Sequence, residues 1–270
     1  MSIISQQFKD AVVSIGIKNE NKIMWIGTGF FVSKHINNDN YLLYLVSNKH
    51  VLEGNKSVVI RLREKTTGQL REIEMPLTDP EINVYKTHNN PNIDIAVVPI
   101  NGGYITKNNL NLNAFNLDDN AVSSDEFIDC GGGEGSIIYM LGYPMGLVDI
   151  ESTAPICRMG CVARWDKNEI KRNNYVLIDI QNFPGNSGSP IITRPEILSI
   201  GDSKAFSKCS LLGIVNAYIP YEERLINSQT KKTVEIKSEN SGLAIVFPVE
   251  YIRDIINPLT ELIVKKNTIL

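Results

Sequence analysis

The chain has 270 residues, of which 43% are hydrophobic and 21% are charged, and its formal net charge is −3. This composition is ordinary for a globular protein with enough chain for one large domain or two small ones. With no basic block, the sequence argues against a nucleic-acid backbone as the main partner. It has no run of 18 apolar residues and no leader-like start, so we expect no membrane span and a cytoplasmic location.

Short strand-like runs separated by polar turns occupy the first part of the chain, and helical periodicity is weak there. The expected strands are 11–17, 22–26, 29–32, 41–47 and 57–62. This spacing predicts an antiparallel β-barrel or sandwich.

Two residues of this region are candidates for catalysis. His50 follows the strand 41–47 and precedes an apolar pair, which is a rigid mounting for a general base, although a lone histidine there is more often a surface or core residue. Asp94 lies in the apolar run 92–100, where a carboxylate is costly unless it is paired. A protonated histidine would compensate the charge of this carboxylate. Hydrogen bonds from turn amides at the start of the strand are an alternative of equal weight.

Residues 101–127 are rich in Asn, Asp, Gly and Ser and are predicted to connect two units, 8–100 and 128–248. The glycine-rich segment 129–135 lacks the Lys-Ser/Thr pair and the following helix of a phosphate loop, so a turn is predicted there.

The second unit is again predicted to consist of strands, at 136–142, 156–164, 175–180, 190–193, 210–217 and 242–247. The polar segments 199–208 and 221–240 are expected to be surface loops. Apolar residues at helical spacing in 249–256 predict a C-terminal helix within 249–270 that loosens or kinks at Pro258.

The four cysteines, Cys130, Cys157, Cys161 and Cys209, are expected to be buried and reduced. If Cys157 and Cys161 share one strand, their Cα atoms lie roughly 13 Å apart, too far for a disulfide. With three histidines and no paired CxxC, a zinc site is poorly supported, and we predict no metal and no cofactor.

The turn after the strand 175–180 carries a candidate nucleophile, Ser187. The flanking Gly185 and Gly188 permit a tight backbone path, so the N–H groups of Gly185 and Ser187 can point into one hollow beside the hydroxyl. A nucleophile beside such an oxyanion cradle is what acyl transfer requires. Without partners elsewhere, the same pattern is an ordinary Ser/Gly hairpin turn.

The order His50, Asp94, Ser187 in an all-β chain fits one of three unrelated hydrolase designs. The blocks Ser47-Asn-Lys-His-Val, Ile93-Asp-Ile-Ala-Val-Val and Pro184-Gly-Asn-Ser-Gly-Ser-Pro resemble the active-site blocks of chymotrypsin-like (PA clan) serine peptidases. They are most similar to the bacterial trypsin-like branch that includes the high-temperature-requirement proteases, here without a PDZ domain. Supporting blocks lie in order at 27–32, 141–146, 212–216 and 242–248.

The resemblance implies an all-β fold of two six-stranded antiparallel barrels with the active site between them. His50 would take the proton of Ser187, Asp94 would orient the imidazole, and the N–H groups of Gly185 and Ser187 would form the oxyanion hole. The implied activity is that of a serine endopeptidase with a polypeptide substrate. The alternatives are a catalytically silent, protease-like binding module and a protease subunit that a regulatory partner activates.

Departures from the family pattern bear on regulation and specificity. Asn186 stands where digestive enzymes carry an aspartate that pairs with a newly cut N-terminus, which favours regulation by loops or by a partner protein. Gln181 stands where enzymes that cut after Arg or Lys have an acidic residue, so we expect preference for an uncharged side chain, unless the nearby Asp179 reverses it. By resemblance, the residues that line the substrate pocket are Gln181, Asn182, Asn216, Ala217, Tyr218 and Gly242.

Overall fold

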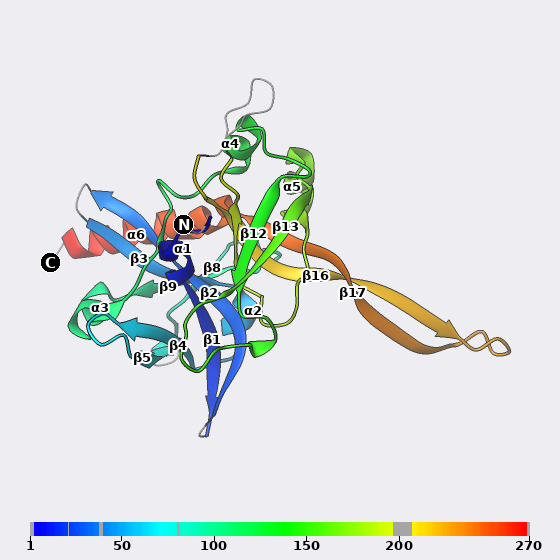
Figure 1. The fold of residues 1–270 in the computed structure, drawn as a ribbon, viewed down its shortest axis with the longest axis horizontal. Helices are drawn as coiled ribbons and strands as arrows, with labels where there is room; N and C mark the ends of the chain where they lie inside the picture. Colours follow the sequence, from blue (N-terminus) through cyan, green and yellow to red (C-terminus); the bar gives the residue numbers. More distant parts are fainter. Residues whose placement is uncertain (1–2, 21, 38–39, 80–81, 197–206, 269–270) are drawn as a thin grey trace.

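The computed structural model describes residues 3–20, 22–37, 40–79, 82–196 and 207–268. Its strands form a closed six-stranded barrel and a second, nine-stranded sheet, and a long helix ends the chain (Figure 1). The expected all-β, chymotrypsin-like class is confirmed.

The nine-stranded sheet is built by the first half of the chain. Its strands follow the order β10-β4-β1-β2-β3-β9-β8, with β5 added beside β4 and β11 beside β2. Apolar side chains alternate along them and enclose a core that includes Ile15, Phe31 and Leu45. The strands are β1 (Val12–Asn19), β2 (Lys22–Asn37), β3 (Asn40–Ser47), β4 (Ser57–Glu64), β5 (Leu70–Pro76), β8 (Lys86–Thr87), β9 (Ala96–Ile100), β10 (Leu110–Asn111) and β11 (Phe115–Asn116).

Short elements link these strands, including a separate two-stranded pair, β6 (Thr78–Asp79) and β7 (Ile82–Asn83). The segment predicted as the connection, 101–127, contains α3, β10 and β11, because its Leu110 and Phe115 are buried in the first half of the molecule. The short helices are α1 (Gln6–Asp10), α2 (Lys49–Leu52), α3 (Gly102–Lys107), α4 (Ser124–Asp129), η1 (Pro144–Gly146) and α5 (Lys167–Asn173).

The closed barrel is built by the second half. Its strand order is β12-β13-β14-β17-β16-β15, and its interior holds Ile138, Ile178, Leu212 and Val246. Its strands are β12 (Ile137–Gly142), β13 (Ile156–Arg164), β14 (Val176–Asp179), β15 (Pro190–Thr193), β16 (Leu211–Ile226) and β17 (Thr233–Pro248).

The segment 221–240, which we call the arm, corrects the prediction of a surface loop. It is a hairpin in which β16 and β17 continue beyond the barrel and pair from Pro220↔Asn240 to Ile226↔Thr233 (Figure 1). Its many charges suggested a loop, but Tyr, Leu, Ile and Val interleave with them as in a strand. The other expected loop, 199–208, lies mostly outside the described residues.

Helix α6 (Val249–Thr268) joins the two halves into one body. Its Ile252 and Ile256 are buried in a core that includes Phe30 of the first sheet and Ile214 of the barrel. The Tyr44 hydroxyl also hydrogen-bonds the Thr260 hydroxyl at 2.7 Å. The helix continues through Pro258. Within the described residues, none of the helices has the length and apolar character needed to cross a bilayer.

The four cysteines are free, and Cys157 and Cys161 lie on the same strand, β13. The prediction that all four are buried is wrong: Cys209 is buried, Cys130 and Cys161 are half-buried and Cys157 is exposed. The reason is that β13 has one buried residue, Val162, and that Cys130 lies at the end of α4 rather than in a strand.

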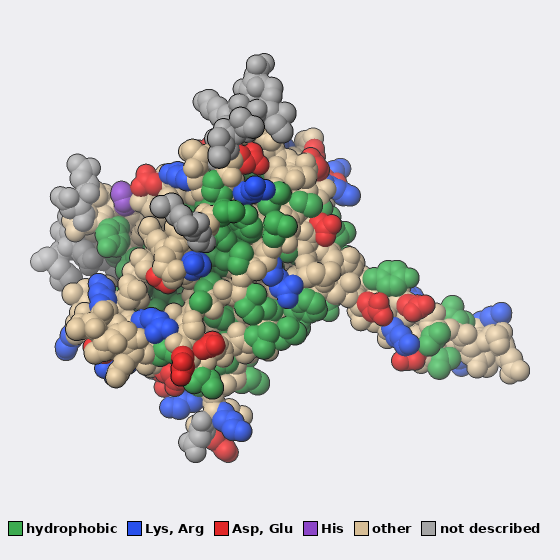
Figure 2. Space-filling model, viewed as in Figure 1, with side chains coloured by type: hydrophobic (Ala, Val, Ile, Leu, Met, Phe, Trp, Pro, Cys, Tyr) green, Lys and Arg blue, Asp and Glu red, His purple; other side chains and the backbone are tan. Residues whose placement is uncertain are grey.

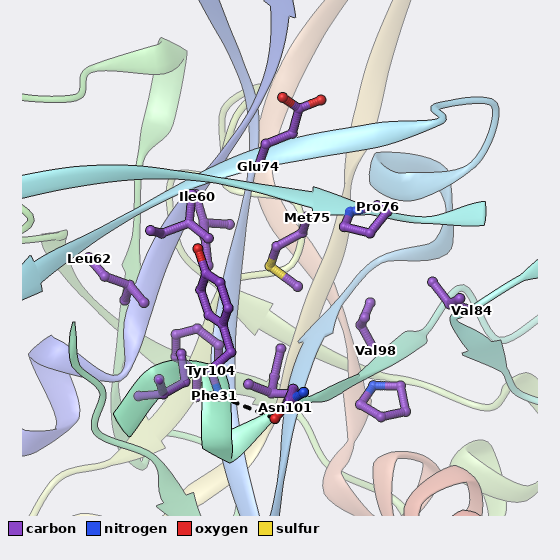
Figure 3. Close-up of a pocket in the computed structure, with 14 residues that line it drawn as sticks. Phe31, Ile60, Leu62, Glu74, Met75, Pro76, Val84, Val98, Asn101 and Tyr104 are labelled. Atoms are coloured by element: carbon purple, nitrogen blue, oxygen red, sulfur yellow. Dashed lines mark hydrogen bonds between the residues drawn. The ribbon is translucent and has the colours of Figure 1, made fainter. Parts of the chain in front are cut away.

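An apolar cavity of about 330 Å³ opens between β4 and β5 on one side and β9 and α3 on the other. Figure 3 shows Ile60, Met75 and Tyr104 around it. None of His50, Asp94 and Ser187 lines this cavity, so it is separate from the predicted site.

Candidate active site

His50 and Asp94 meet because of the register between two strands. Ser47 at the end of β3 pairs with Ala96 at the start of β9, so the residues just beyond each strand end lie side by side. The chain leaves β3 into the single-turn helix α2, which carries His50. The Asn48 side chain fixes this exit by donating a hydrogen bond of 2.8 Å to the carbonyl oxygen of Asp94.

The Asp94 carboxylate holds His50 at two points. Its Oδ2 hydrogen-bonds the ring at Nδ1, and its Oδ1 accepts the backbone N–H of His50 at 3.0 Å. Burial raises the pKa of Asp94, but the hydrogen bonds from His50 outweigh burial and hold this pKa below its ordinary value of 3.8. Asp94 is therefore ionised at neutral pH, and the imidazole is oriented with Nε2 directed away from the carboxylate.

Ser187 lies in a tight turn between β14 and β15. Gly185 (φ 95°) and Gly188 (φ 86°) adopt left-handed conformations that disfavour a side chain, and the amide of Ser189 donates to the carbonyl of Asn186 at 2.9 Å. Because of this backbone path, the amides of residues 185 and 187 do not pair with a neighbouring strand of the described structure.

The orientation of the Gly185 amide is set from outside the turn. The carbonyl of Pro184 accepts a hydrogen bond from the amide of Met145, and in a trans peptide the carbonyl and the next N–H point in opposite directions. The Gly185 N–H therefore points away from Met145. Neither this N–H nor that of Ser187 donates to another described residue, so both are available to an oxyanion.

Thr28 on β2 fastens the Ser187 turn to the first sheet. Its hydroxyl donates to the carbonyl of Gly185 at 2.7 Å and accepts the amide of Tyr143 at 3.1 Å, and its own amide donates to the carbonyl of Ser187 at 2.9 Å. Thr28 is completely buried. Thr28 was predicted only as part of the block 27–32, with no role of its own; the signal was a hydroxyl between two glycines in the apolar stretch 23–32.

The elements that carry His50 and Ser187 converge at Gly27. A Cβ at Gly27 would lie 2.6 Å from the side chain of Val51, the residue after His50, and 3.4 Å from the carbonyl oxygen of Ser187. The tertiary fold therefore brings the His50 helix and the Ser187 turn to the same place.

The Ser187 hydroxyl itself points to a different partner. It donates to the carbonyl oxygen of Asn216 at 3.3 Å, and no hydrogen bond joins it to the His50 ring in the described part of the chain. The pairing of β16 with β17 shifts register between Val215 and Tyr218, and this bulge frees the Asn216 carbonyl from the ladder.

Some of the predicted pocket residues cluster at Gly242, which has φ 85°. A Cβ there would lie 3.8 Å from both Asp179 Oδ1 and Gln181 Nε2. Asn182 is buried, and its carbonyl accepts the Asn240 side chain. Asn216, Ala217 and Tyr218 are half-buried on β16.

Asn186 belongs to the same turn as Ser187, and only 1% of it is exposed. Neither polar atom of its side chain has a hydrogen-bond partner among the described residues. An ionised aspartate at such a position would be costly without a counter-ion, which agrees with the neutral residue found there.

No group of three or more His, Cys, Asp or Glu side chains in the described ranges is arranged to hold a metal ion.

Comparisons with known proteins found one matching family model and a similar solved structure. The chain matches the family model of the trypsin-like peptidase domain over residues 27–196, a range that contains His50, Asp94 and Ser187. None of the curated proteins matches it. Among solved structures, it is similar to the apo crystal structure of the MamO protease domain from Magnetospirillum magneticum, with 14% identity over 92% of this chain and 96% of that one and a TM-score of 0.46. The chain belongs to the trypsin-like peptidase domain family.

Proposed function

We propose that this protein is a serine endopeptidase that uses His50, Asp94 and Ser187. The observation that carries the proposal is the Asp94 carboxylate, which binds both the ring and the amide of His50 on the sheet to which the Ser187 turn is fastened. Asp94 orients the imidazole and stabilises its protonated form, so that Nε2 serves as the general base.

The reaction proceeds by acyl transfer. The Ser187 oxygen attacks the carbonyl carbon of the substrate while its proton passes to His50 Nε2, and the oxyanion accepts hydrogen bonds from the amides of Gly185 and Ser187. The proton then passes from His50 to the leaving amine as the peptide bond breaks. A water molecule attacks the ester in the second half, and its proton returns through His50 to Ser187.

A second candidate is a peptidase that stays locked until a partner binds. The observation in its favour is the hydrogen bond from Ser187 to Asn216, which directs the hydroxyl away from the base. Rotation of the Ser187 side chain, whose staggered positions are separated by low barriers, is the smallest movement that would direct it to His50. A protein that is silent in all conditions would instead be a protease-like binding module.

Labelling with a fluorophosphonate probe tests these candidates. The endopeptidase predicts that the purified chain is labelled, that Ser187→Ala abolishes labelling, and that Ser189→Ala, a matched change two residues away, leaves it intact. Labelling that appears only after lysate is added indicates the locked form. A well-folded protein that stays unlabelled in both conditions would refute the peptidase assignment.

A further inference from the structure

The arm stands apart from the rest of the molecule. It projects beyond the barrel as a two-stranded ribbon (Figures 1 and 2), and every residue from 221 to 239 is exposed. Within the described residues, its two strands pair only with each other. An isolated two-stranded hairpin is marginally stable in water, and its unpaired edges are templates for another chain.

The arm also exposes more apolar surface than a solvated hairpin requires. Five large apolar side chains along its length are 46–70% exposed: Tyr221, Leu225, Ile226, Val234 and Ile236. Apolar groups spread over a ribbon with no core of its own indicate a surface that is covered in the working assembly.

The charges on the arm are divided along its length. The half next to the barrel, residues 221–223 and 237–239, carries three glutamates and one lysine, a net charge of −2. The outer half, residues 224–236, carries Arg224, Lys231, Lys232 and one glutamate, a net charge of +2. Figure 2 shows acidic side chains near the base of the arm and basic ones at its tip.

We propose that the arm is a self-association surface through which two copies of this chain form a dimer. The two ribbons lie antiparallel about a two-fold axis, so the basic tip of each meets the acidic base of the other. A two-fold interface uses the same patch twice, and this patch is complementary to itself only in the antiparallel arrangement. The exposed apolar side chains on the face that each ribbon turns toward its partner are then buried between the two ribbons.

Two pairs of charge reversals test this arrangement. Lys231→Glu with Lys232→Glu makes the tip acidic, and Glu222→Lys with Glu239→Lys makes the base basic. The side chains of Lys231, Lys232 and Glu239 make no ion pair within the described residues, and Glu222 contacts only Arg224, at 3.6 Å. The matched control is Lys18→Glu with Lys22→Glu, two exposed lysines at the end of β1 and the start of β2.

Analytical ultracentrifugation of the full chain gives the readout, at concentrations up to about 100 µM. We expect the unaltered chain and the control to be dimers that weaken with salt. Each reversed variant alone is expected to be a folded monomer, and an equimolar mixture of the two is expected to restore a dimer. Restoration is the decisive result, because misfolding of one variant cannot produce it.

Other outcomes would overturn the proposal. They are an unaltered chain that stays monomeric, reversed variants that remain dimeric, and a mixture that does not associate. If the chain is monomeric and its arm binds a different protein, that protein is the partner of the arm and self-association is excluded. None of these measurements uses the chemistry of Ser187, so the result is independent of the proposed peptidase activity.

Discussion

The Ser187 hydroxyl donates its hydrogen bond to the carbonyl oxygen of Asn216, at 3.3 Å, while the His50 ring is held by Asp94. The proposed base is thus oriented, and the hydroxyl of the proposed nucleophile is directed away from it. A ligand that offers an N–H group to the Asn216 carbonyl would compete for this acceptor and release the hydroxyl toward His50. In the proposed peptidase, occupation of the Asn216 carbonyl and the direction of the Ser187 hydroxyl are therefore coupled.

Replacing Ser187 with alanine separates chemistry from folding. The hydroxyl makes one long hydrogen bond, so its loss should change the free energy of unfolding by less than about 1 kcal/mol. Turnover should fall by about 10⁴ to 10⁶. Peptidase assays and thermal unfolding of Ser187→Ala and Ser189→Ala check both expectations, and a Ser187→Ala protein with normal turnover would contradict the assignment.

Asp94→Asn should lower turnover by about 10⁴, because an amide cannot accept from both the ring and the backbone of His50 and favours the wrong tautomer. The matched control is Asp254→Asn. Asp254 also contacts a histidine, His88, at 3.4 Å, but this contact is not part of the proposed site. Steady-state kinetics should show a loss for Asp94→Asn only; equal losses would indicate a general effect of removing carboxylates.

The same carboxylate should stabilise the fold in a pH-dependent way. Its folded-state pKa lies below the unfolded value of about 3.9, so its contribution is fully present above that value and is lost as the pH falls through the folded pKa. Urea unfolding of the unaltered chain and of Asp94→Asn should therefore differ at pH 7, and the difference should shrink below pH of about 4. A constant difference across this range would show that the charge of Asp94 does not contribute.

Thr28→Val should impair the site without touching a reacting atom. The substitution keeps the shape but leaves the Gly185 carbonyl and the Tyr143 amide unpaired in a buried place, which should cost about 2–4 kcal/mol of stability. Probe labelling of Ser187 should also slow at least tenfold, since the turn loses one of its two hydrogen bonds to residue 28 and keeps only the one from the backbone amide. Thr28→Ser, which keeps the hydroxyl, should restore most of both properties; failure to do so would assign the effect to packing of the methyl group.

Cleavage of a peptide library should show preference for an uncharged side chain at the primary position, because Gln181 is neutral. Asp179 lies close enough to be the competing determinant, since its carboxylate and the Gln181 amide face the same point beside Gly242. If Gln181 sets the preference, Asp179→Asn changes the profile little. A profile dominated by Arg or Lys that Asp179→Asn abolishes would show that Asp179 sets the specificity.

Much of the fold was predictable from local patterns. Alternation of apolar residues marked most of the long strands, and the helical spacing in 249–256 marked α6. The arm was not predicted as a hairpin, because its many charged residues hid the strand-like spacing of apolar residues such as Tyr221, Leu225 and Ile236. Strand β5, with mostly exposed residues, was missed for a similar reason.

For the site, the candidate residues could be found from local sequence: a serine between glycines, and a histidine and an aspartate at strand ends. Those features depend on neighbouring residues alone. Three other features depend on segments far apart in the chain and follow only from the fold: the Ser47↔Ala96 register that joins His50 to Asp94, the contacts of Thr28 with the turn, and the direction of the Ser187 hydroxyl toward Asn216. A freely rotating hydroxyl follows whichever acceptor lies nearest, and here a bulge in a distant strand supplies it.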